Sequence, residues 1–280
     1  MRDELRFFQR ICVTSMVNMS SVLSPVVISV AHAGRDYGDL GELARVPLDG
    51  LRPLEDRYAD ALTAGAGPHR VIAFDKARAW IDVNREPHDL DSSMVAGATA
   101  RILSPRARGG LGLVPRRLSA VGELWRRPLT RVELDERLFD YRGFHARIEM
   151  ALAEARTAFG RAVLIDLHSM PSLPSGVEAV LGNAHGAACS RETTETVMTL
   201  LRDAGLNAAL NQPYAGGAIV RRHGRPAIAV QAFQIEFDRR LYLDDALDAP
   251  GTGLSAIQAL VRQIANTLAE PAAALPIAAE

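Results

Sequence analysis

The sequence has little cysteine, no dominant charge and no long apolar run. Only Cys12 and Cys189 occur in 280 residues, far apart and outside any C-x-x-C pattern, which excludes a disulfide framework and a cysteine metal site. The formal net charge is -1, so no overall basic charge favours nucleic acid or an anionic membrane as a partner. No stretch approaches the roughly 18 consecutive apolar residues of a membrane-spanning helix.

The remaining composition is that of a folded globular protein. Hydrophobic residues make up 48% of the chain and charged residues 23%, which is unlike a disordered chain. The low use of cysteine favours a cytoplasmic location. Residues 1–22 lack the apolar core and cleavage site of a signal peptide, and we expect a weakly ordered extension there. We expect a single domain over 23–270 and a flexible alanine-rich tail over 271–280.

Strands alternate with helices along the chain, and this order predicts an α/β fold with a mainly parallel sheet. The segment 91–130 is rich in glycine, proline and arginine and predicts a long connection, of the kind that is usually functional or disordered. Apolar runs and helical periodicity predict strands over 26–31, 70–74, 79–83, 162–167, 206–210 and 227–237 and helices over 53–65, 131–159, 190–205 and 252–269.

Two of the predicted strands each lead into a histidine. VVISVAHAG carries His32 and AVLIDLHSMP carries His168. Because ligands and catalytic groups gather at the carboxyl ends of parallel strands, this placement brings two imidazoles together from distant parts of the chain. The alternative is two unrelated polar residues at strand ends, and the acidic residues nearby favour a shared site.

Three carboxylates are candidates for the same site. A hydrolytic zinc site needs about three ligands from His, Asp or Glu and a nearby carboxylate that moves a proton. Glu55 and Asp56 are adjacent on the first turn of a predicted helix, so only one of them can face the site. Glu236 lies inside an apolar strand, where a carboxylate needs a cation or a catalytic role. An ion pair with Arg239 or Arg240 is the alternative for Glu236.

Arginines and amides indicate a small anionic substrate. Asn84 and Arg85, in IDVNREP, combine an amide donor with a planar guanidinium that suits a carboxylate. NQPYAGGAIVRRHG adds Tyr214, a Gly-Gly pair that permits close backbone approach, and Arg221. Local basic clusters in a near-neutral chain fit a small anion better than a polyanion. Solvated surface arginines are the alternative.

These segments together resemble the N-formylglutamate amidohydrolase family, which is similar to zinc carboxypeptidases and aspartoacylases. The resemblance implies a three-layer α/β/α sandwich with a mainly parallel mixed sheet, like that of the carboxypeptidases. It also implies one divalent ion, Zn²⁺ or another divalent metal. The matching segments, in order, are 26–34, 53–60, 79–87, 144–152, 163–171, 211–224 and 232–244.

The resemblance also implies roles for particular residues. His32, His168 and either Asp56 or Glu55 would hold the metal, and Glu236 would activate water. Asn84 and Arg85 would hold a substrate carboxylate. Tyr214 and His145 are our own further substrate-binding candidates. For His145 a structural role is the alternative. Arg221 is our candidate for the second carboxylate or the oxyanion.

The expected reaction is hydrolysis of the N-acyl bond of an acidic amino acid, by preference N-formyl-L-glutamate to formate and glutamate. A deacylase or carboxypeptidase for another N-acyl amino acid or short peptide is the alternative within enzymes. A catalytically silent protein that binds an acidic metabolite is the alternative outside them. The sequence leaves the oligomeric state open.

Overall fold

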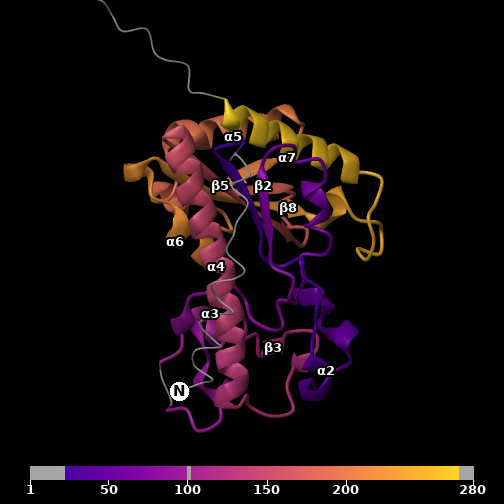
Figure 1. Ribbon diagram of the computed structural model, residues 1–280. Helices are drawn as coiled ribbons and strands as arrows, with labels where there is room; N and C mark the ends of the chain where they lie inside the picture. Colours follow the sequence, from indigo (N-terminus) through magenta and orange to yellow (C-terminus); the bar gives the residue numbers. More distant parts are fainter. Residues whose placement is uncertain (1–22, 100–101, 271–280) are drawn as a thin grey trace, which may run out of the picture.

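The computed structural model describes residues 23–99 and 102–270, so the expected extension 1–22 and tail 271–280 lie outside the described residues. Its centre is a six-stranded sheet with the strand order β2-β1-β5-β8-β6-β7 (Figure 1). Neighbouring strands run parallel except β6 and β8, which are antiparallel. The predicted mainly parallel mixed sheet is therefore confirmed. The strands are β1 Val26–Val30, β2 Arg70–Ala73, β5 Ala162–Met170, β6 Ala179–Gly182, β7 Ala208–Leu210 and β8 Val230–Asp238.

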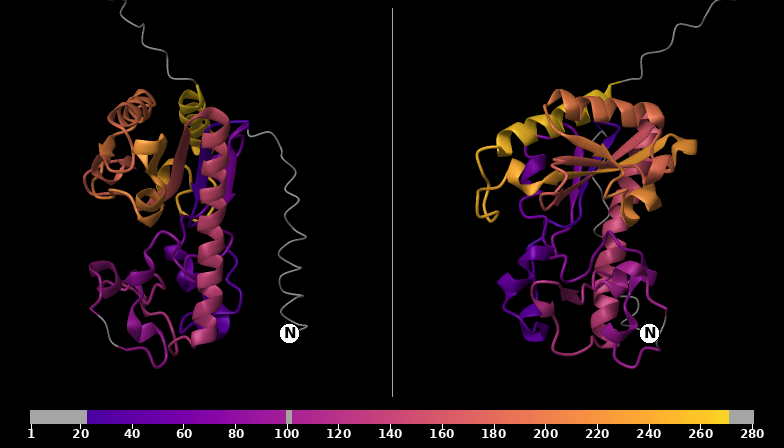
Figure 2. Two further views of the ribbon diagram at one scale, coloured as in Figure 1. Left: turned by 60° about the vertical axis from the view of Figure 1, so that its left-hand side comes forward. Right: turned by 180° about the vertical axis from the view of Figure 1, so that it is seen from behind.

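Helices cover both faces of this sheet (Figure 2). Side chains alternate between the two faces of a strand. Val27 and Leu164 therefore point into one apolar core, and Val26 and Ile165 into the other. The first core is closed by helices α4 and α6 and the second by α5 and α7, which gives three layers. These helices are α4 Arg131–Phe159, α5 Arg191–Asp203, α6 Ala218–His223 and α7 Leu254–Ala269.

A second group of short elements surrounds the N-terminal half of α4, in the lower part of Figure 1. The predicted long connection 91–130 contributes much of it. The group contains α2 Leu40–Leu43, α3 Pro105–Arg108, the hairpin β3 Arg117–Leu118 with β4 Gly122–Glu123, and the 3-10 helices η1 Leu48–Leu54, η3 Pro87–Asp89 and η4 Ser92–Met94.

Two predicted elements were wrong. The predicted helix over 53–65 is replaced by η1, which ends at Leu54, and by the short 3-10 helix η2, Ala61–Thr63. The backbone N–H of Asp56 instead donates to the carbonyl of His32 at 3.0 Å, which draws this segment to the end of β1. The predicted strand over 79–83 is an irregular turn that joins no sheet.

Helix α4 holds the irregular segment 78–85 by three side chains that donate to its carbonyls. Arg137 Nη1 donates to Trp80 O at 2.8 Å, the Tyr141 hydroxyl to Arg85 O at 3.0 Å, and His145 Nε2 to Val83 O at 2.9 Å. The three donors are four residues apart and therefore share one face of the helix. This ladder gives the segment the fixed backbone that a strand would have gained from neighbours.

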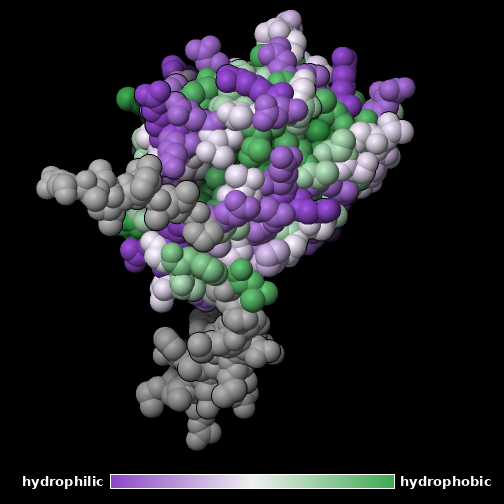
Figure 3. All heavy atoms as spheres, turned by 90° about the horizontal axis from the view of Figure 1, so that it is seen from above, coloured by the Kyte–Doolittle hydropathy of each residue, from purple (hydrophilic) through white to green (hydrophobic). Residues whose placement is uncertain are grey.

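The outer helices α5 and α7 bury their apolar sides in the second core. Figure 3 views the molecule from above, where hydrophilic and hydrophobic side chains are interspersed. Within residues 23–99 and 102–270, no helix combines the length and the hydropathy needed to cross a membrane.

Because α4 carries the ladder, its first turn matters for stability. Thr130 accepts a hydrogen bond from the Glu133 N–H at 3.2 Å, and Glu133 accepts one from the Thr130 N–H at 2.6 Å, which is a capping box. We expect Thr130→Ala to lower the free energy of unfolding by about 1 kcal/mol, measured by urea denaturation. Thr199→Ala, at an exposed helix position, is the control and should change it by less than about 0.5 kcal/mol. Equal effects would contradict the capping role.

Candidate functional site

The site is built at the carboxyl ends of the parallel strands β1, β5 and β8. His32 follows the end of β1, and His168 lies within β5, one residue beyond the predicted strand end at 167. His168 pairs in register with Glu236 of β8, so both side chains point to the same face of the sheet. On this face the apolar core beneath gives way to buried polar groups toward the strand ends.

Three potential ligand atoms converge at this edge. His168 Nδ1 lies 2.9 Å from Asp56 Oδ2, and His32 Nδ1 lies 3.4 Å from the same oxygen. His32, Asp56 and His168 are buried, and one potential ligand atom from each lies within 4.8 Å of the others. The hydrogen bond from Asp56 N to His32 O places the carboxylate there.

Each imidazole is held from behind by a second carboxylate. His32 Nε2 donates to Asp82 Oδ1 at 2.8 Å, and His168 Nε2 donates to Asp166 Oδ2 at 2.8 Å. Because a carboxylate only accepts, both Nε2 atoms carry the proton, and in a neutral ring the lone pair is on Nδ1. Both lone pairs are therefore directed at Asp56. His32 Nδ1 has no hydrogen-bond partner among the described residues.

With both imidazoles neutral, the two Nδ1 atoms and the Asp56 carboxylate are all hydrogen-bond acceptors, and no donor from the described part of the chain lies between them. Burial opposes the ionisation of Asp56, but the imidazoles of His168 and His32 beside it hold its pKa well below its usual range. Burial also opposes the charged form of His168, but the carboxylates of Asp166 and Asp56 raise its pKa well above the ordinary value. A proton on His168 is one way to satisfy the acceptors. A divalent cation is the other, and two imidazoles with one carboxylate are a zinc-type donor set.

Glu55, the alternative to Asp56, points elsewhere. Its carboxylate accepts hydrogen bonds from the Tyr37 hydroxyl and from Arg57 Nη1, the latter at 2.9 Å. Glu55 is therefore fully engaged outside the histidine pair, and the structure places Asp56 alone of the two beside His32 and His168.

Glu236 is buried beside this group and is fixed by an amide network. Gln234 Nε2 donates to Glu236 Oε1 at 2.6 Å, and Gln234 Oε1 accepts from the Gly217 N–H at 3.1 Å. Asn84 Oδ1 accepts from the Ile219 N–H at 3.0 Å, so the first turn of α6 is tied to the same network. A Cβ on Gly217 would lie 2.0 Å from Asn84 Oδ1, which is why this position requires glycine.

Burial raises the pKa of Glu236 to about 8. Neither Arg239 nor Arg240, the partners considered for an ion pair, pairs with Glu236. Arg239 donates to Asp56 Oδ1 at 3.3 Å and to the Glu55 carbonyl at 2.7 Å. A buried carboxyl with a raised pKa, next to a cluster of potential metal ligands, is typical of a group that moves a proton.

A cavity of about 460 Å³ opens above these groups. Besides the convergent residues, it is lined by Asn84, Tyr214, Gly216 and Gly217 and by four arginines. Arg78 pairs with Asp82 at 2.8 Å and Arg239 with Asp56. Arg85 donates to the carbonyls of Leu111 and Asn84, and Arg106, on α3, pairs with no carboxylate in the described part of the chain. The cavity is therefore strongly cationic around its acidic floor.

The comparisons with known proteins agree with this arrangement. The family model described as N-formylglutamate amidohydrolase matches residues 24–243, which include every group described above. The chain belongs to the N-formylglutamate amidohydrolase family. The resemblance drawn from the sequence is thereby confirmed.

Relatives within this family are similar over most of their length. The N-formylglutamate deformylase of Pseudomonas putida is 31% identical over 79% of this chain and 82% of its own. That of Pseudomonas aeruginosa is 29% identical over 79% and 83%. The crystal structure of N-formylglutamate amidohydrolase from Ralstonia eutropha superposes with a TM-score of 0.81 at 30% identity, covering 88% of this chain and 93% of that one.

Within this family member, two predicted site residues lie outside the cavity. Arg221 is exposed, and its Nη1 donates to the Gly216 carbonyl at 3.0 Å. His145 is fully buried beneath α6, where it bonds Val83 and His223 rather than facing the cavity. Tyr214 and Asn84 do line the cavity. The Asn84 side chain also accepts a hydrogen bond from the first turn of α6, so it has a structural role as well.

Sequence reasoning missed the groups behind the histidines. Asp166 lies two residues before His168, and that spacing places both side chains on one face of the strand. This periodicity was a usable signal. Arg78 and Asp82 carry no such signal, because the segment that presents them has no regular structure and its path depends on α4.

The His145–His223 pair gives a test of the scaffold. His145 Nδ1 and His223 Nε2 are 2.9 Å apart. Burial, with Arg222 nearby, lowers the pKa of His145 from 6.5 to about 4, and burial and His145 lower that of His223 to about 3. The unfolded chain therefore binds protons between about pH 6.5 and 4 that the folded chain does not, so stability falls as pH falls through this range.

We expect His145→Gln to reduce this dependence, because glutamine still donates to the Val83 carbonyl but does not titrate. Between pH 7 and pH 5, the loss of unfolding free energy in the variant should be smaller than in the parent protein by about 1–2 kcal/mol. Urea denaturation at both pH values measures it, with the exposed His185 replaced by glutamine as control. Equal losses of unfolding free energy between pH 7 and pH 5 in all three proteins would contradict a lowered pKa of His145.

Proposed function

We propose that this protein is a metal-dependent hydrolase that cleaves N-formyl-L-glutamate to formate and glutamate. The convergence of His32 Nδ1, Asp56 Oδ2 and His168 Nδ1 beside the buried Glu236 carries this proposal. The similarity to two N-formylglutamate deformylases and an N-formylglutamate amidohydrolase supports the substrate.

The three convergent residues would hold one divalent ion, and Zn²⁺ suits a set of two imidazoles and one carboxylate with open positions. Such an ion would polarise the scissile carbonyl, acidify the attacking water and favour the ionised form of Glu236 by its charge. Asp82 and Asp166 fix the tautomer and orientation of His32 and His168, which is the support that metal-binding histidines require.

Glu236 is the proposed base. Gln234 restrains its Oε1 atom, and the Oε2 atom remains for the attacking water. Glu236 would take the proton of this water as its oxygen adds to the formyl carbon. It would then give that proton to the leaving nitrogen as the C–N bond breaks. The register of Glu236 with His168 keeps this carboxylate beside the reacting carbon.

The arginines of the cavity would recognise the two carboxylates of the substrate. Arg85 is held by the carbonyls of Leu111 and Asn84, which presents its guanidinium in a fixed orientation, and we assign it the α-carboxylate. Arg106 lines the same cavity without a carboxylate partner in the described residues. We assign Arg106, rather than the exposed Arg221, to the side-chain carboxylate.

The roles of base and ligand are separable by substitution. Glu236→Gln should lower kcat by about 10²–10⁴, the usual contribution of positioned acid–base catalysis, while bound zinc stays near one per chain. Asp56→Ala should lose both zinc and activity, and Glu55→Gln is the matched control that should keep zinc. Formate release and elemental analysis measure the two quantities. Loss of zinc in Glu236→Gln with full activity after zinc is restored would refute the assignment.

Substrate charge distinguishes the arginines. Arg106→Gln should lower kcat/KM for N-formylglutamate by about 10–100-fold, the contribution of a charge-assisted hydrogen bond, and should affect N-formylalanine much less. Arg221→Gln is the control and should affect both substrates alike. Selective loss of N-formylglutamate hydrolysis in Arg221→Gln would instead support the assignment made from sequence. Faster turnover of N-formylalanine in the unmodified enzyme would favour a broader N-acyl amino acid deacylase.

A further inference from the structure

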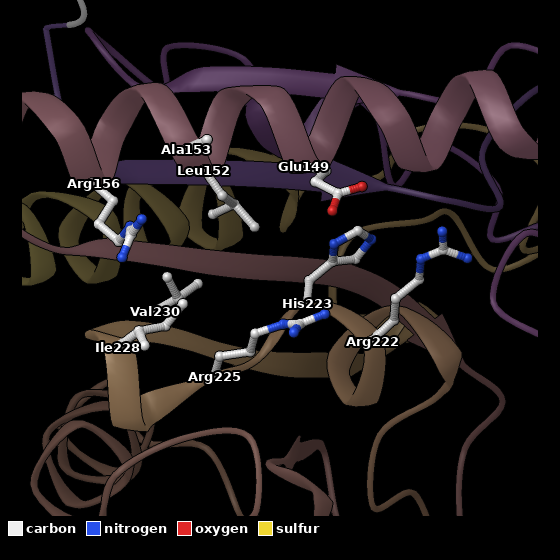
Figure 4. Close-up of a pocket in the computed structure, with 9 residues that line it drawn as sticks. All are labelled: Glu149, Leu152, Ala153, Arg156, Arg222, His223, Arg225, Ile228 and Val230. Carbon is white, nitrogen blue, oxygen red and sulfur yellow. The ribbon is translucent and has the colours of Figure 1, made fainter.

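A second pocket lies at the C-terminal end of α6, whereas the active-site cavity lies before its N-terminal end, and the two share no lining residue. It has a volume of about 310 Å³ and lies between α4, the end of α6 and the start of β8 (Figure 4). Its lining consists of Glu149, Leu152, Ala153, Arg156, Arg222, His223, Arg225, Ile228 and Val230.

The arginines of this pocket carry charge that the protein does not neutralise. Within the described residues, Arg156, Arg222 and Arg225 form no ion pair with a carboxylate, and Glu149 forms none with a cation. Figure 4 shows Arg156 toward one end of the pocket and Arg222 toward the other, with the Arg225 guanidinium between them. The apolar side chains of Leu152 and Val230 lie on the Arg156 side.

His223 adds an acceptor to this pocket. His145 Nε2 donates to the Val83 carbonyl, so in the neutral His145 ring Nδ1 is an acceptor, and His223 Nε2 must donate to it. The lone pair of His223 is therefore on Nδ1, which has no hydrogen-bond partner in the part of the chain that the structure describes. His223 is 6% exposed and lines the pocket, so a donor from a ligand satisfies this atom.

The pocket thus offers three cations for anionic groups, and a carboxylate with an imidazole acceptor for a cationic donor. We propose that it is a binding site for a small molecule with two anionic groups and one amino group, which is the chemistry of an acidic amino acid. Arg156 and Arg222 are placed to hold the two anionic groups, with Arg225 between them. Glu149 and His223 Nδ1 receive the ammonium group. This site is independent of the proposed reaction.

The test is calorimetric titration of the zinc-loaded full chain with L-glutamate and with glutarate, which lacks the amino group. All variants are compared in the parent protein and in an Arg85→Gln background, which weakens binding in the active-site cavity. Arg225→Gln and Arg156→Gln should each weaken glutamate binding at one site by about 10-fold or more in both backgrounds. Arg142→Gln, an exposed arginine of α4 outside the pocket, is the control and should leave binding unchanged.

Glu149→Gln tests the amino group separately. Unmodified protein should bind glutamate more tightly than glutarate at this site, and Glu149→Gln should reduce that preference by about 10-fold while glutarate binding stays or improves. The proposal is overturned if the Arg85→Gln background alone abolishes binding of both ligands. It is also overturned if Arg156→Gln, Arg225→Gln and Glu149→Gln bind both ligands as the parent protein does. Arg156, Arg225 and Glu149 are exposed, so their substitution by glutamine should leave the fold intact.

Discussion

Buried acceptors without donors are the constraint on which this structure depends. Asp82 and Asp166 accept hydrogen bonds from Nε2 of His32 and His168. Both Nδ1 lone pairs are therefore directed at the ionised Asp56. In a low-dielectric interior, such a set needs positive charge, which either a proton on an imidazole or a bound cation would supply. The outer carboxylates therefore do more than orient rings, because they determine that the space between the histidines and Asp56 requires positive charge.

The same constraint explains the irregular segment 78–85. A regular strand would present its side chains alternately to two faces. This segment instead directs Arg78 and Arg85 to one cavity and pairs both of them with Asp82. An irregular path leaves backbone carbonyls without the hydrogen bonds that neighbouring strands would have donated. The side chains of Arg137, Tyr141 and His145, on one face of α4, donate hydrogen bonds to three of these carbonyls. His145 is thus a positioning residue, and its distance from the cavity is part of that role.

The sequence predicted what local periodicity encodes. The helix over 131–159 and the strands at 26, 162 and 227 follow from alternation and apolar runs, and the first of these agrees with α4 to the residue. The helix over 53–65 was wrong because the bond from Asp56 N to His32 O is a long-range contact that overrides local preference. The antiparallel β6 and the short α6 were missed for the same reason, since α6 is ordered by the Asn84 side chain from far along the chain.

The arginines show why residue type alone did not identify the substrate contacts. Sequence reasoning selected Arg221 from a conspicuous Arg-Arg pair, yet that side chain is exposed and bonds a carbonyl of its own loop. Arg78 and Arg239 lie in the cavity, but each pairs with an acidic residue of the site and so offsets the charge of Asp82 and Asp56. Only the guanidiniums left over from this pairing are free to attract an anion. Arg85 approaches Asp82 only at 3.7 Å and otherwise donates to carbonyls, and Arg106 forms no ion pair with a carboxylate among the described residues. The selection of a substrate arginine therefore follows from the distribution of buried acids rather than from the arginines themselves.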